Sequence, residues 1–553
     1  MNITNKMTIK SQELISAAIT AQKTRTFYAS WPENPKAYAE DANAKGLEAF
    51  QKMLNTDFSE LHENPHRGRI GEEISPYMML GLGIKYPQYG AEELIRYAKE
   101  VSSVWAKVSK EERASILIES LENISNRFFE LAYATMHTTG QAFMMSFQAS
   151  GPHSNDRAME VISMAYEEMS RFQEEVNWVK NMGKFDLTLR KTFKTIPRGI
   201  GLVIGCSTFP TWNTVPGLYA NLMAGNPVIV KPHPKSILPI AIVVAEIQNA
   251  LKNAGISPNV VQLGADTSKQ QITKELAEHK DVKLIDYTGG SAFGDYLEKI
   301  PGKITFTEKA GVNSVILESV KNPEPIFGNI AFSASLYSGQ MCTAPQNIFI
   351  SESGIQTENG NLSFDECASQ IANAVKALVE NPKAGPHTLG AIQNDLTINR
   401  VEAAKKSATV ILDSIAVVNP EFPEARIKSP VVMVTDAENT DAWRHECFGP
   451  AIFIIKTKSA AHSLELASNA ALELGAITCL CYSQDEEFMN QTAEIMNGSF
   501  TPVSFNFNGA AFVNQHAAFS DFHVTGGNPS GNAGFTNPEY VNRRFVWVGN
   551  RYA

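Results

Sequence analysis

Residues 224–232 read Ala-Gly-Asn-Pro-Val-Ile-Val-Lys-Pro, a short apolar strand that lies between a glycine turn and a proline. A strand at 201–205 precedes it, and a helix over 237–253 follows it. The same alternation continues in a strand at 260–263, a helix over 267–278 and a strand at 283–287. Strands that alternate with helices form βαβ units and lie in a parallel sheet. The sequence therefore predicts an α/β fold.

A second α/β block begins near residue 311. We expect helices over 325–338 and 364–380, and strands at 347–351, 409–412, 452–456 and 476–482. Residues 1–60 are charged and predicted to be helical, residues 91–175 are strongly helical, and a hairpin is expected over 75–87. The basic stretch 184–194 alternates with apolar residues and has no core of its own, which is typical of edge strands that pair with another chain.

Length and composition exclude several classes of protein. A chain of 553 residues is too long for one hydrophobic core, so two or three domains are expected. The net charge is −10 and no dense run of Lys and Arg occurs, which argues against nucleic acid or an anionic membrane as the main partner.

The cysteines and the N-terminus indicate a cytoplasmic protein. Residues 1–23 are polar and lack the apolar segment of a secretory signal. The six cysteines show no disulfide-framework spacing, which fits a reducing compartment. Cys479 and Cys481 lie in an apolar strand without a nearby histidine, so we interpret them as structural, and no metal site is expected.

A thiol and a carboxylate on separate segments are the strongest chemical signal. Cys342 lies in the run 338–343, Ser-Gly-Gln-Met-Cys-Thr, in the loop predicted between a helix and a strand. Glu308 follows an alternating strand-like run at 304–307. A thiolate can form a thioester, and a carboxylate can activate the water that hydrolyses it. Such a thiol needs a polar, partly exposed environment that favours the thiolate.

Glycines mark a possible nucleotide site. Gly289, Gly290 and Gly294 form a Gly-Gly-x-x-x-Gly turn after the strand at 283–287. Glycines of this kind let the backbone approach a pyrophosphate at a helix start. Taken alone, the same pattern also fits an ordinary tight turn.

These blocks, in this order and at these spacings, resemble the aldehyde dehydrogenase superfamily over roughly residues 65–550. The resemblance implies a Rossmann-type nucleotide-binding domain, an α/β catalytic thiol domain and a β oligomerisation arm. The nucleotide-binding domain would comprise 1–177 and 198–309, with 1–60 as a helical extension. The thiol domain would be 310–520, and the arm 178–197 with 537–553. A homodimer or higher homo-oligomer is then expected.

The resemblance also implies roles for individual residues. Cys342 would be the nucleophile and Glu308 the base that hydrolyses the acyl-enzyme. Relatives that pass the acyl group to coenzyme A lack this glutamate, so a carboxylate product is expected. The residues that would bind the cofactor are Lys231, His233, Gly289, Gly290, Gly294, Glu446 and Phe448.

The sequence departs from the family pattern at three places. Thr208 stands where the family has its oxyanion asparagine, and its hydroxyl can donate one hydrogen bond. Asn213 is an alternative donor, and Lys309 replaces the usual leucine after the glutamate. NAD-preferring relatives carry a glutamate three residues after the lysine, where Pro234 stands here. With no carboxylate to repel a 2′-phosphate, NADP is expected, and NAD remains possible.

Within the superfamily, the phenylacetate-degradation (PaaN-type) branch is most similar. The similarity lies in the long N-terminal segment, in 206–210, in 231–234 and in the ending with His523 and Gly526-Gly527. It implies a ring-opened, CoA-bound semialdehyde as substrate, and a separate ring-opening hydratase as a pathway partner. The alternatives are a general aromatic or aliphatic aldehyde dehydrogenase, an acylating enzyme or a reductase, and a catalytically weak scaffold that kept the fold.

Overall fold

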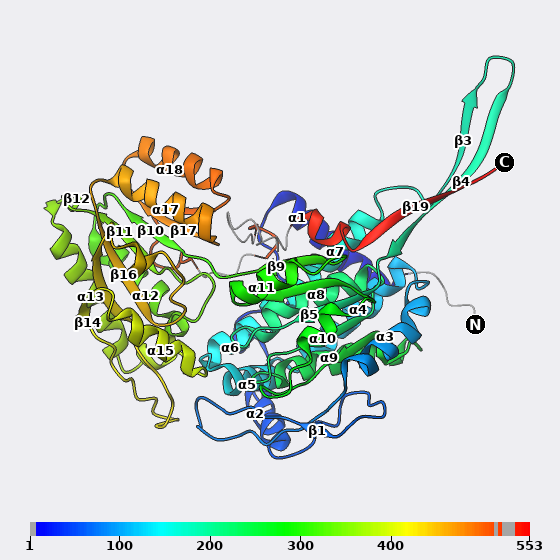
Figure 1. The fold of residues 1–553 in the computed structure, drawn as a ribbon, viewed down its shortest axis with the longest axis horizontal. Helices are drawn as coiled ribbons and strands as arrows, with labels where there is room; N and C mark the ends of the chain where they lie inside the picture. The colour runs from blue at the N-terminus through cyan, green and yellow to red at the C-terminus, as the bar shows by residue number, and fades with distance from the viewer. Residues whose placement is uncertain (1–6, 514–517, 523–536) are drawn as a thin grey trace.

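The computed structural model describes residues 7–513, 518–522 and 537–553, so the predictions at His523 and Gly526-Gly527 fall outside the described residues. Two lobes each contain a largely parallel sheet, and a β-arm projects from one of them (Figure 1). This confirms the predicted α/β fold. None of the described helices combines the length and apolar character that are needed to cross a bilayer.

The first lobe contains a five-stranded parallel sheet in the order β7-β6-β5-β8-β9. Its strands are β5 (Ile200–Ile204), β6 (Val228–Lys231), β7 (Val261–Leu263), β8 (Val282–Thr288) and β9 (Ile304–Glu308). The helices between them are α8 (Pro210–Met223), α9 (Leu238–Asn253), α10 (Thr273–Glu278) and α11 (Ser291–Glu298), with a 3-10 turn at Pro258–Val260. The strands are buried on both faces, which explains their continuous apolar runs.

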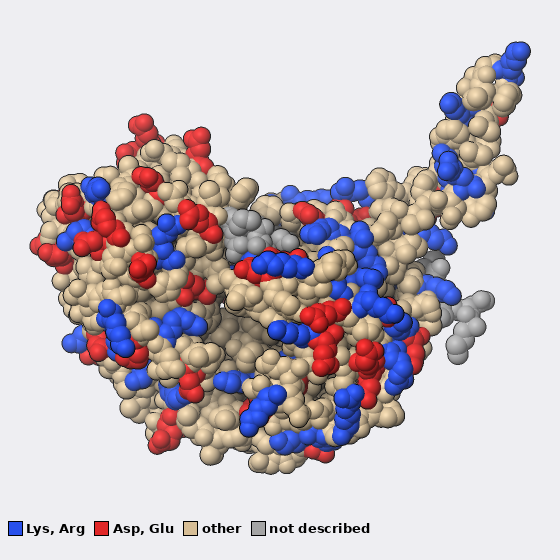
Figure 2. Space-filling model, in the orientation of Figure 1, with Lys and Arg blue, Asp and Glu red and all other residues tan. Residues whose placement is uncertain are grey.

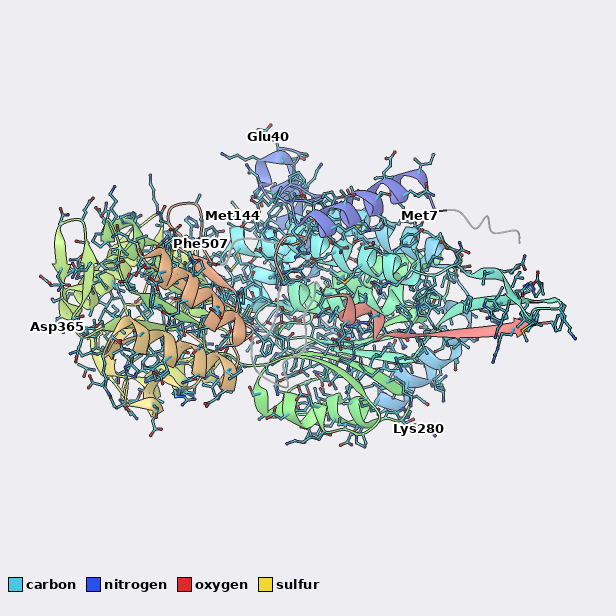
Figure 3. The ribbon with its side chains drawn as sticks, turned by 90° about the horizontal axis from the view of Figure 1, so that it is seen from above. Met7, Glu40, Met144, Lys280, Asp365 and Phe507 are labelled. Atoms are coloured by element: carbon cyan, nitrogen blue, oxygen red, sulfur yellow. The ribbon has the colours of Figure 1, made fainter. Side chains whose placement is uncertain are left out.

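A helical layer precedes this sheet in the chain. It comprises α1 (Ile9–Thr24), a 3-10 turn (Pro35–Ala37), α2 (Ala42–Met53), α3 (Ala91–Trp105), α4 (Lys110–Ser125), α5 (Phe128–Thr139), α6 (Phe143–Ser150) and α7 (Pro152–Met169). Seen from above, Met7 and Glu40 lie on one side of this lobe and Lys280 on the other (Figure 3). The expected hairpin pairs β1 (Arg69–Ile70) with β2 (Tyr86–Pro87), so its first strand lies earlier in the chain than predicted.

The second lobe contains a seven-stranded sheet in the order β14-β15-β16-β11-β10-β17-β18. Its strands are β10 (Ser314–Leu317), β11 (Asn347–Ser351), β14 (Thr409–Leu412), β15 (Val431–Asp436), β16 (Ala451–Thr457), β17 (Cys479–Tyr482) and β18 (Val503–Phe505). All neighbouring strands are parallel except β14, which is antiparallel to β15.

Helices cover this sheet, and a small hairpin forms a separate two-stranded sheet beside it. They are α12 (Pro323–Ser335), a 3-10 turn (Leu336–Gly339), α13 (Phe364–Glu380), α14 (Gly385–Thr388), α15 (Asp395–Ala404), α16 (Thr440–Trp443), α17 (Ala460–Leu474) and α18 (Glu486–Gly498), with the hairpin β12 (Ile355–Thr357) and β13 (Gly360–Leu362). Cys479 and Cys481 pack in the core of this lobe, as their apolar surroundings predicted.

Two predicted elements begin later in the structure than expected, and in each case a side chain binds the backbone of the residues just before the element. The helix expected over 267–278 begins only at Thr273, because the Asp266 carboxylate accepts a hydrogen bond from the Ile272 N–H (3.1 Å) and holds the preceding loop. The strand expected at 476–482 begins at Cys479, because the Ile477 and Thr478 N–H groups donate to the side chain of Asn313.

The arm is a three-stranded antiparallel sheet in which β4 (Asp186–Pro197) lies between β3 (Glu175–Asn181) and β19 (Phe545–Tyr552). It carries exposed apolar side chains, among them Val179, Phe185 and Val548. Figure 2 shows lysine and arginine side chains along the arm, whereas charges of both signs are interspersed over the two lobes.

A buried ion pair fixes the C-terminal segment to the five-stranded sheet. Arg544, which follows α19 (Pro538–Asn542), donates to both oxygens of Asp286 in β8, at 2.8 and 2.6 Å. The Tyr540 hydroxyl and the Asn221 amide also donate to this carboxylate, each at 3.0 Å. Every oxygen of the carboxylate is therefore satisfied, which offsets the cost of removing both charges from water.

We predict that Arg544→Leu strongly destabilises the protein, because it leaves the buried Asp286 carboxylate without its cation. The expected loss is about 3–5 kcal/mol, measured as a lower midpoint of urea unfolding. Arg543→Leu is the matched control, since that neighbouring side chain is 35% exposed and lies 3.8 Å from Glu539. Equal effects of the two substitutions would contradict the assignment.

Candidate active site

The candidate site lies where opposite ends of the two sheets meet. Glu308 is the last residue of β9, so it lies at the C-terminal edge of the five-stranded sheet. Cys342 lies in the loop before β11, at the N-terminal edge of the seven-stranded sheet. The chain crosses directly from one edge to the other, because β10 begins at Ser314. The structure thus brings together the two residues on which the sequence argument depends.

The loop that carries Cys342 begins with an unusual turn. Tyr337, Ser338 and Gly339 all have left-handed backbone conformations, with φ values of 52°, 52° and 65°. Such a conformation costs non-glycine residues on the order of 1 kcal/mol or more. The Ser338 hydroxyl compensates by donating to the Gly390 and Lys428 carbonyls, at 2.9 and 3.0 Å. A Cβ atom at Gly339 would lie only 2.3 Å from the Gly449 carbonyl oxygen, so this position requires glycine.

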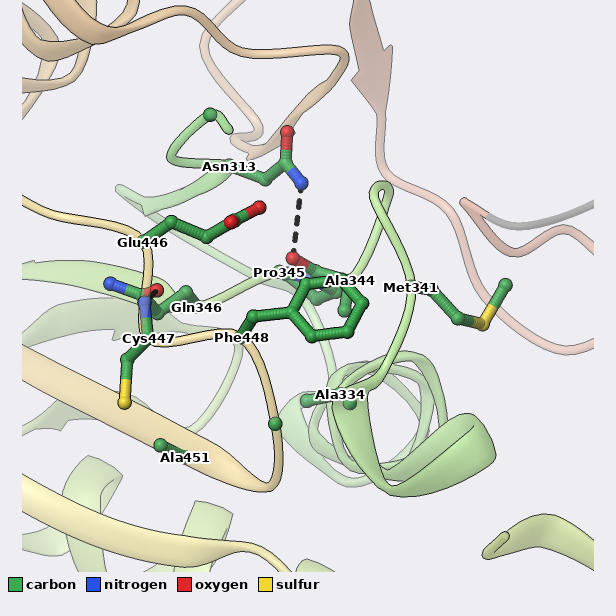
Figure 4. A pocket seen from close by; sticks show the side chains of 13 residues that line it. Asn313, Ala334, Met341, Ala344, Pro345, Gln346, Glu446, Cys447, Phe448 and Ala451 are labelled. Atoms are coloured by element: carbon green, nitrogen blue, oxygen red, sulfur yellow. Dashed lines mark hydrogen bonds between the residues drawn. The ribbon is translucent and has the colours of Figure 1, made fainter. Parts of the chain in front are cut away.

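Asn313 clamps the Cys342 loop to the start of the sheet. Its amide nitrogen donates to the Cys342 carbonyl at 2.7 Å and to the Ala344 carbonyl at 3.1 Å, and the second bond is drawn in Figure 4. Its amide oxygen accepts from the Ile477 and Thr478 N–H groups. Sequence reasoning missed this residue, although a polar side chain directly before an apolar strand is a detectable signal.

Gln346 ties the Cys342 loop to the segment that contains Glu446. Its side-chain oxygen accepts from the Cys447 N–H at 2.6 Å, and its side-chain nitrogen donates to the His445 carbonyl at 2.9 Å. Glu446 and Phe448 lie with Asn313 and Met341 around a small cavity between the two segments (Figure 4). The predicted residues Glu446 and Phe448 therefore lie beside the thiol loop.

The electrostatics of the site favour protonated groups. Burial raises the pKa of Cys342 well above its ordinary value, and the charge and hydrogen bond of the adjacent Glu308 raise it further, as do Cys206 and Glu446. In the structure the neighbours of this half-buried thiol favour the thiol form over the thiolate. The physical reason is that the thiol's neighbours are carboxylates and a second thiol.

That second thiol, Cys206, is a site residue whose role sequence reasoning missed. The Asn213 amide donates to its sulfur at 3.4 Å, and the Thr208 hydroxyl oxygen lies 4.0 Å from it. The Thr208 carbonyl accepts from the Gln141 side chain at 2.7 Å, which fixes the turn before α8. Both candidate oxyanion donors, Thr208 and Asn213, thus lie around Cys206.

Lys309, the departure from the family pattern next to Glu308, points toward α11. Its ammonium group pairs with Asp295 and, at 3.2 Å, with Glu298, and its side chain is only 2% exposed. A Cβ atom on Gly294 would lie only 2.5 Å from the aliphatic part of the Lys309 side chain, so Gly294 lies directly against it. Ion pairs with residues of α11 therefore accommodate the buried charge of Lys309.

The glycine turn lies directly beside Glu308. The Gly289 N–H donates to the Glu308 carbonyl at 3.0 Å, and the Tyr287 hydroxyl donates to the Gly290 carbonyl at 2.9 Å. Gly290 precedes α11, and a Cβ atom there would meet nothing within 4 Å. Gly290 thus leaves open space at a helix start, as a pyrophosphate site requires, whereas Gly294 packs against Lys309.

Lys231, at the end of β6, pairs with the Asp266 carboxylate at 2.6 Å and donates to the Pro232 carbonyl at 2.8 Å. Burial and, to a smaller extent, the charges of Lys231 and Lys235 together lower the pKa of His233 to about 4. Position 234 carries no carboxylate, but Asp266 reaches Lys231 from the loop that follows the neighbouring strand β7.

Comparisons with known proteins identify relatives of this chain by sequence and by fold. The sequence pattern of the aldehyde dehydrogenase family matches residues 85–527. The crystal structure of an NAD-dependent aldehyde dehydrogenase from Burkholderia multivorans is 42% identical and has a TM-score of 0.95, covering 98% of each chain. A 1-pyrroline-5-carboxylate dehydrogenase from Bacillus subtilis is 21% identical over 405 residues, 71% of this chain and 73% of that protein. The 1-pyrroline-5-carboxylate dehydrogenase from Thermus with bound NAD is 18% identical with a TM-score of 0.74, covering 95% and 99% of the chains, which is a likeness of fold.

We predict that Glu446 gives the ligand-free protein a pH-dependent stability. Burial raises the pKa of Glu446 from 4.5 to about 7, while the Gly311 N–H and Arg400 lower it and Glu308 raises it. Its contribution is therefore fully present below pH 4.5 and is lost as the pH rises through about 7. The side chain of Glu446→Gln cannot ionise, so the Tm of this variant minus that of the wild type should increase between pH 5 and pH 8.

Glu438→Gln removes a carboxylate whose side chain is 68% exposed and serves as the control, with a pH profile like that of the wild type. Thermal unfolding of the ligand-free proteins provides the measurement. A constant difference in Tm between wild type and Glu446→Gln across this range would refute the prediction.

Proposed function

The chain belongs to the aldehyde dehydrogenase family, and we propose that Cys342 and Glu308 carry out its oxidation of an aldehyde to a carboxylic acid. The observation that carries the proposal is the contact of this thiol with this carboxylate at the edge of a Rossmann-type sheet. A catalytically weak scaffold would not need to hold Cys342 beside Glu308 in a strained loop that several hydrogen bonds fix.

The chemistry follows from the protonation of the site. Because the thiol is protonated at rest, Glu308 first accepts its proton, and the sulfur then attacks the aldehyde carbon. A bound NAD(P) would supply the acceptor for the hydride of this carbon. Cys342 then holds the acyl group as a thioester. Glu308, after passing the first proton to solvent, accepts a proton from the water that attacks the thioester and returns it to the departing Cys342 sulfur. The products are the carboxylic acid, the reduced cofactor and one proton.

The developing oxyanion needs a hydrogen-bond donor. We propose that Thr208 supplies it through its hydroxyl, with the Asn213 amide as the alternative donor. Both side chains lie around Cys206, whose sulfur interacts electrostatically with Cys342. Asn313 and Gln346 act as positioning residues, because they fix the backbone on each side of the thiol and of Glu446.

We propose the cofactor site along the C-terminal edge of the five-stranded sheet, where open α/β sheets bind nucleotides. The open space at Gly290 and the buried polar groups at the ends of β6 and β7 fit an adenine dinucleotide. The residues that would hold it are Lys231, His233, Gly289, Gly290, Gly294, Glu446 and Phe448.

We propose that residues 1–177 and 198–309 form the nucleotide-binding part, and 310–520 the thiol part. The arm, 178–197 with 537–553, would pair with a second copy in a homo-oligomer. Its exposed apolar side chains and its two open strand edges support this role, since unpaired edges bind other chains.

Two substrates have support, and both are semialdehydes. The similarity to the PaaN-type branch favours a ring-opened, CoA-bound semialdehyde of phenylacetate degradation. A separate hydratase would open the ring, and this enzyme would oxidise the resulting semialdehyde to the acid. The relatives named 1-pyrroline-5-carboxylate dehydrogenase favour a second candidate, the small semialdehyde that forms when the pyrroline ring opens in water. The first requires recognition of a large phosphorylated handle, and the second does not.

We predict that Cys342→Ser and Glu308→Gln fail at different steps. Cys342→Ser cannot form the thioester, so it should show no burst of reduced cofactor and lose several decades in kcat. Glu308→Gln should give a slowed burst of about one equivalent per subunit and then stall, with the acyl-enzyme visible by mass spectrometry. Cys367→Ala, a buried thiol on α13, is the control and should keep activity within a few-fold. A normal steady-state rate in either site variant would refute its assigned role.

We predict that a CoA-bound semialdehyde has a higher kcat/KM than the same aldehyde as a free acid, because remote binding energy lowers the barrier at the reacting carbon. A steady-state panel should include both forms, glutamate semialdehyde, and simple aromatic and aliphatic aldehydes. A free aldehyde that reacts as well as the CoA form would exclude CoA recognition. A preference for glutamate semialdehyde would select the second candidate.

A further inference from the structure

The ends of two neighbouring strands carry a buried ion pair that the proposed mechanism does not use. The Lys231 ammonium group lies 2.6 Å from the Asp266 carboxylate, and the two side chains are 5% and 1% exposed. The second carboxylate oxygen of Asp266 accepts from the Ile272 N–H at 3.1 Å. Asp266 is therefore held on both sides, and it holds Lys231 in place.

This pair occupies the part of the sheet that selects between NAD and NADP. In Rossmann-type sheets, a carboxylate near the end of the second strand binds the ribose hydroxyl and excludes a 2′-phosphate. Here the second strand, β6, ends in Lys231-Pro232-His233-Pro234 and offers no carboxylate. The nearest acidic group at this edge comes instead from the loop that follows β7.

The charges around Lys231 leave little attraction for a phosphate. Asp266 balances the charge of Lys231, and burial with the charges of Lys231 and Lys235 holds His233 neutral at pH 7. Glu72 adds a further negative charge, fixed by the Ser268 N–H at 2.9 Å. A 2′-phosphate carries about −1.5 to −2 charges, and Lys235 is the remaining neighbouring cation among the described residues at this edge.

We propose that Asp266 is a positioning residue that makes this enzyme prefer NAD over NADP, by neutralising Lys231 while leaving its ammonium group able to donate to ribose hydroxyls. The inference rests on the proposed dinucleotide site. It replaces the expectation of NADP, which considered only position 234.

The test measures direct binding of NADH and NADPH by fluorescence titration, which does not require turnover. The wild type should bind NADH at least about tenfold more tightly, as expected for the loss of one charge contact. Asp266→Asn keeps the side-chain volume and an oxygen that can accept from Ile272, but it leaves Lys231 unbalanced. The ratio of the two dissociation constants should then shift toward NADPH by about tenfold, and the shift should shrink at high salt.

Two further variants keep the test decisive. Glu72→Gln, at a partly exposed position, should shift the ratio in the same direction by about threefold, and it tests the proposal if Asp266→Asn does not fold. Glu380→Gln removes a charge from α13 and should leave the ratio of the two dissociation constants unchanged. The Glu380 side chain is 54% exposed. Equal weakening of both nucleotides, or an unchanged ratio in both Asp266→Asn and Glu72→Gln, would overturn the proposal. Failure of the wild type to bind either nucleotide would instead refute the proposed function.

Discussion

The short crossing between the two sheets is the constraint on which the site depends. Residues 309–313 join the end of β9 to the start of β10, and five residues reach at most about 18 Å. The C-terminal edge of one sheet and the N-terminal edge of the other must therefore face each other. Glu308 lies at the start of this crossing and Asn313 at its end. Because Asn313 donates to the Cys342 carbonyl, one stretch of chain positions both the carboxylate and the thiol.

Two groups of the candidate site are held in their protonated forms by their surroundings. Cys342 and Glu446 both have raised pKa values, because burial and neighbouring negative charge disfavour their ionised forms. A thiol held in this state is protected from reaction until its proton is removed. Glu308 lies in contact with it and can serve this purpose in addition to activating water. Placing a positively charged nicotinamide ring nearby would also favour the thiolate, so binding and activation would be coupled.

The nucleotide edge and the arm share a common anchor in β8. Asp286, within this strand, holds Arg544 and Tyr540, and the strand then runs on to the Gly289-Gly290 turn. β19 begins at Phe545, directly after Arg544, so the anchor sets where the arm leaves the lobe. The strand therefore connects the proposed oligomerisation surface with the proposed cofactor site through one buried, fully hydrogen-bonded carboxylate.

The amino-acid sequence by itself determined the α/β class and most strand and helix positions, and it predicted a candidate site that contains Cys342, Glu308, Glu446 and Phe448. Local apolar runs and motif spacing decide these features, and both are visible in one dimension. Three features depended on tertiary structure. Asn313 and Gln346 act through backbone groups far away in the chain, and the protonation of Cys342 depends on burial and on neighbours from other segments. The NADP expectation rested on the absence of a carboxylate at position 234, whereas Asp266 brings a carboxylate to Lys231 from the loop after the adjacent strand β7. Spatial neighbours at the end of a parallel sheet are separated by a whole helix in sequence, and for that reason only the folded chain shows which charges meet.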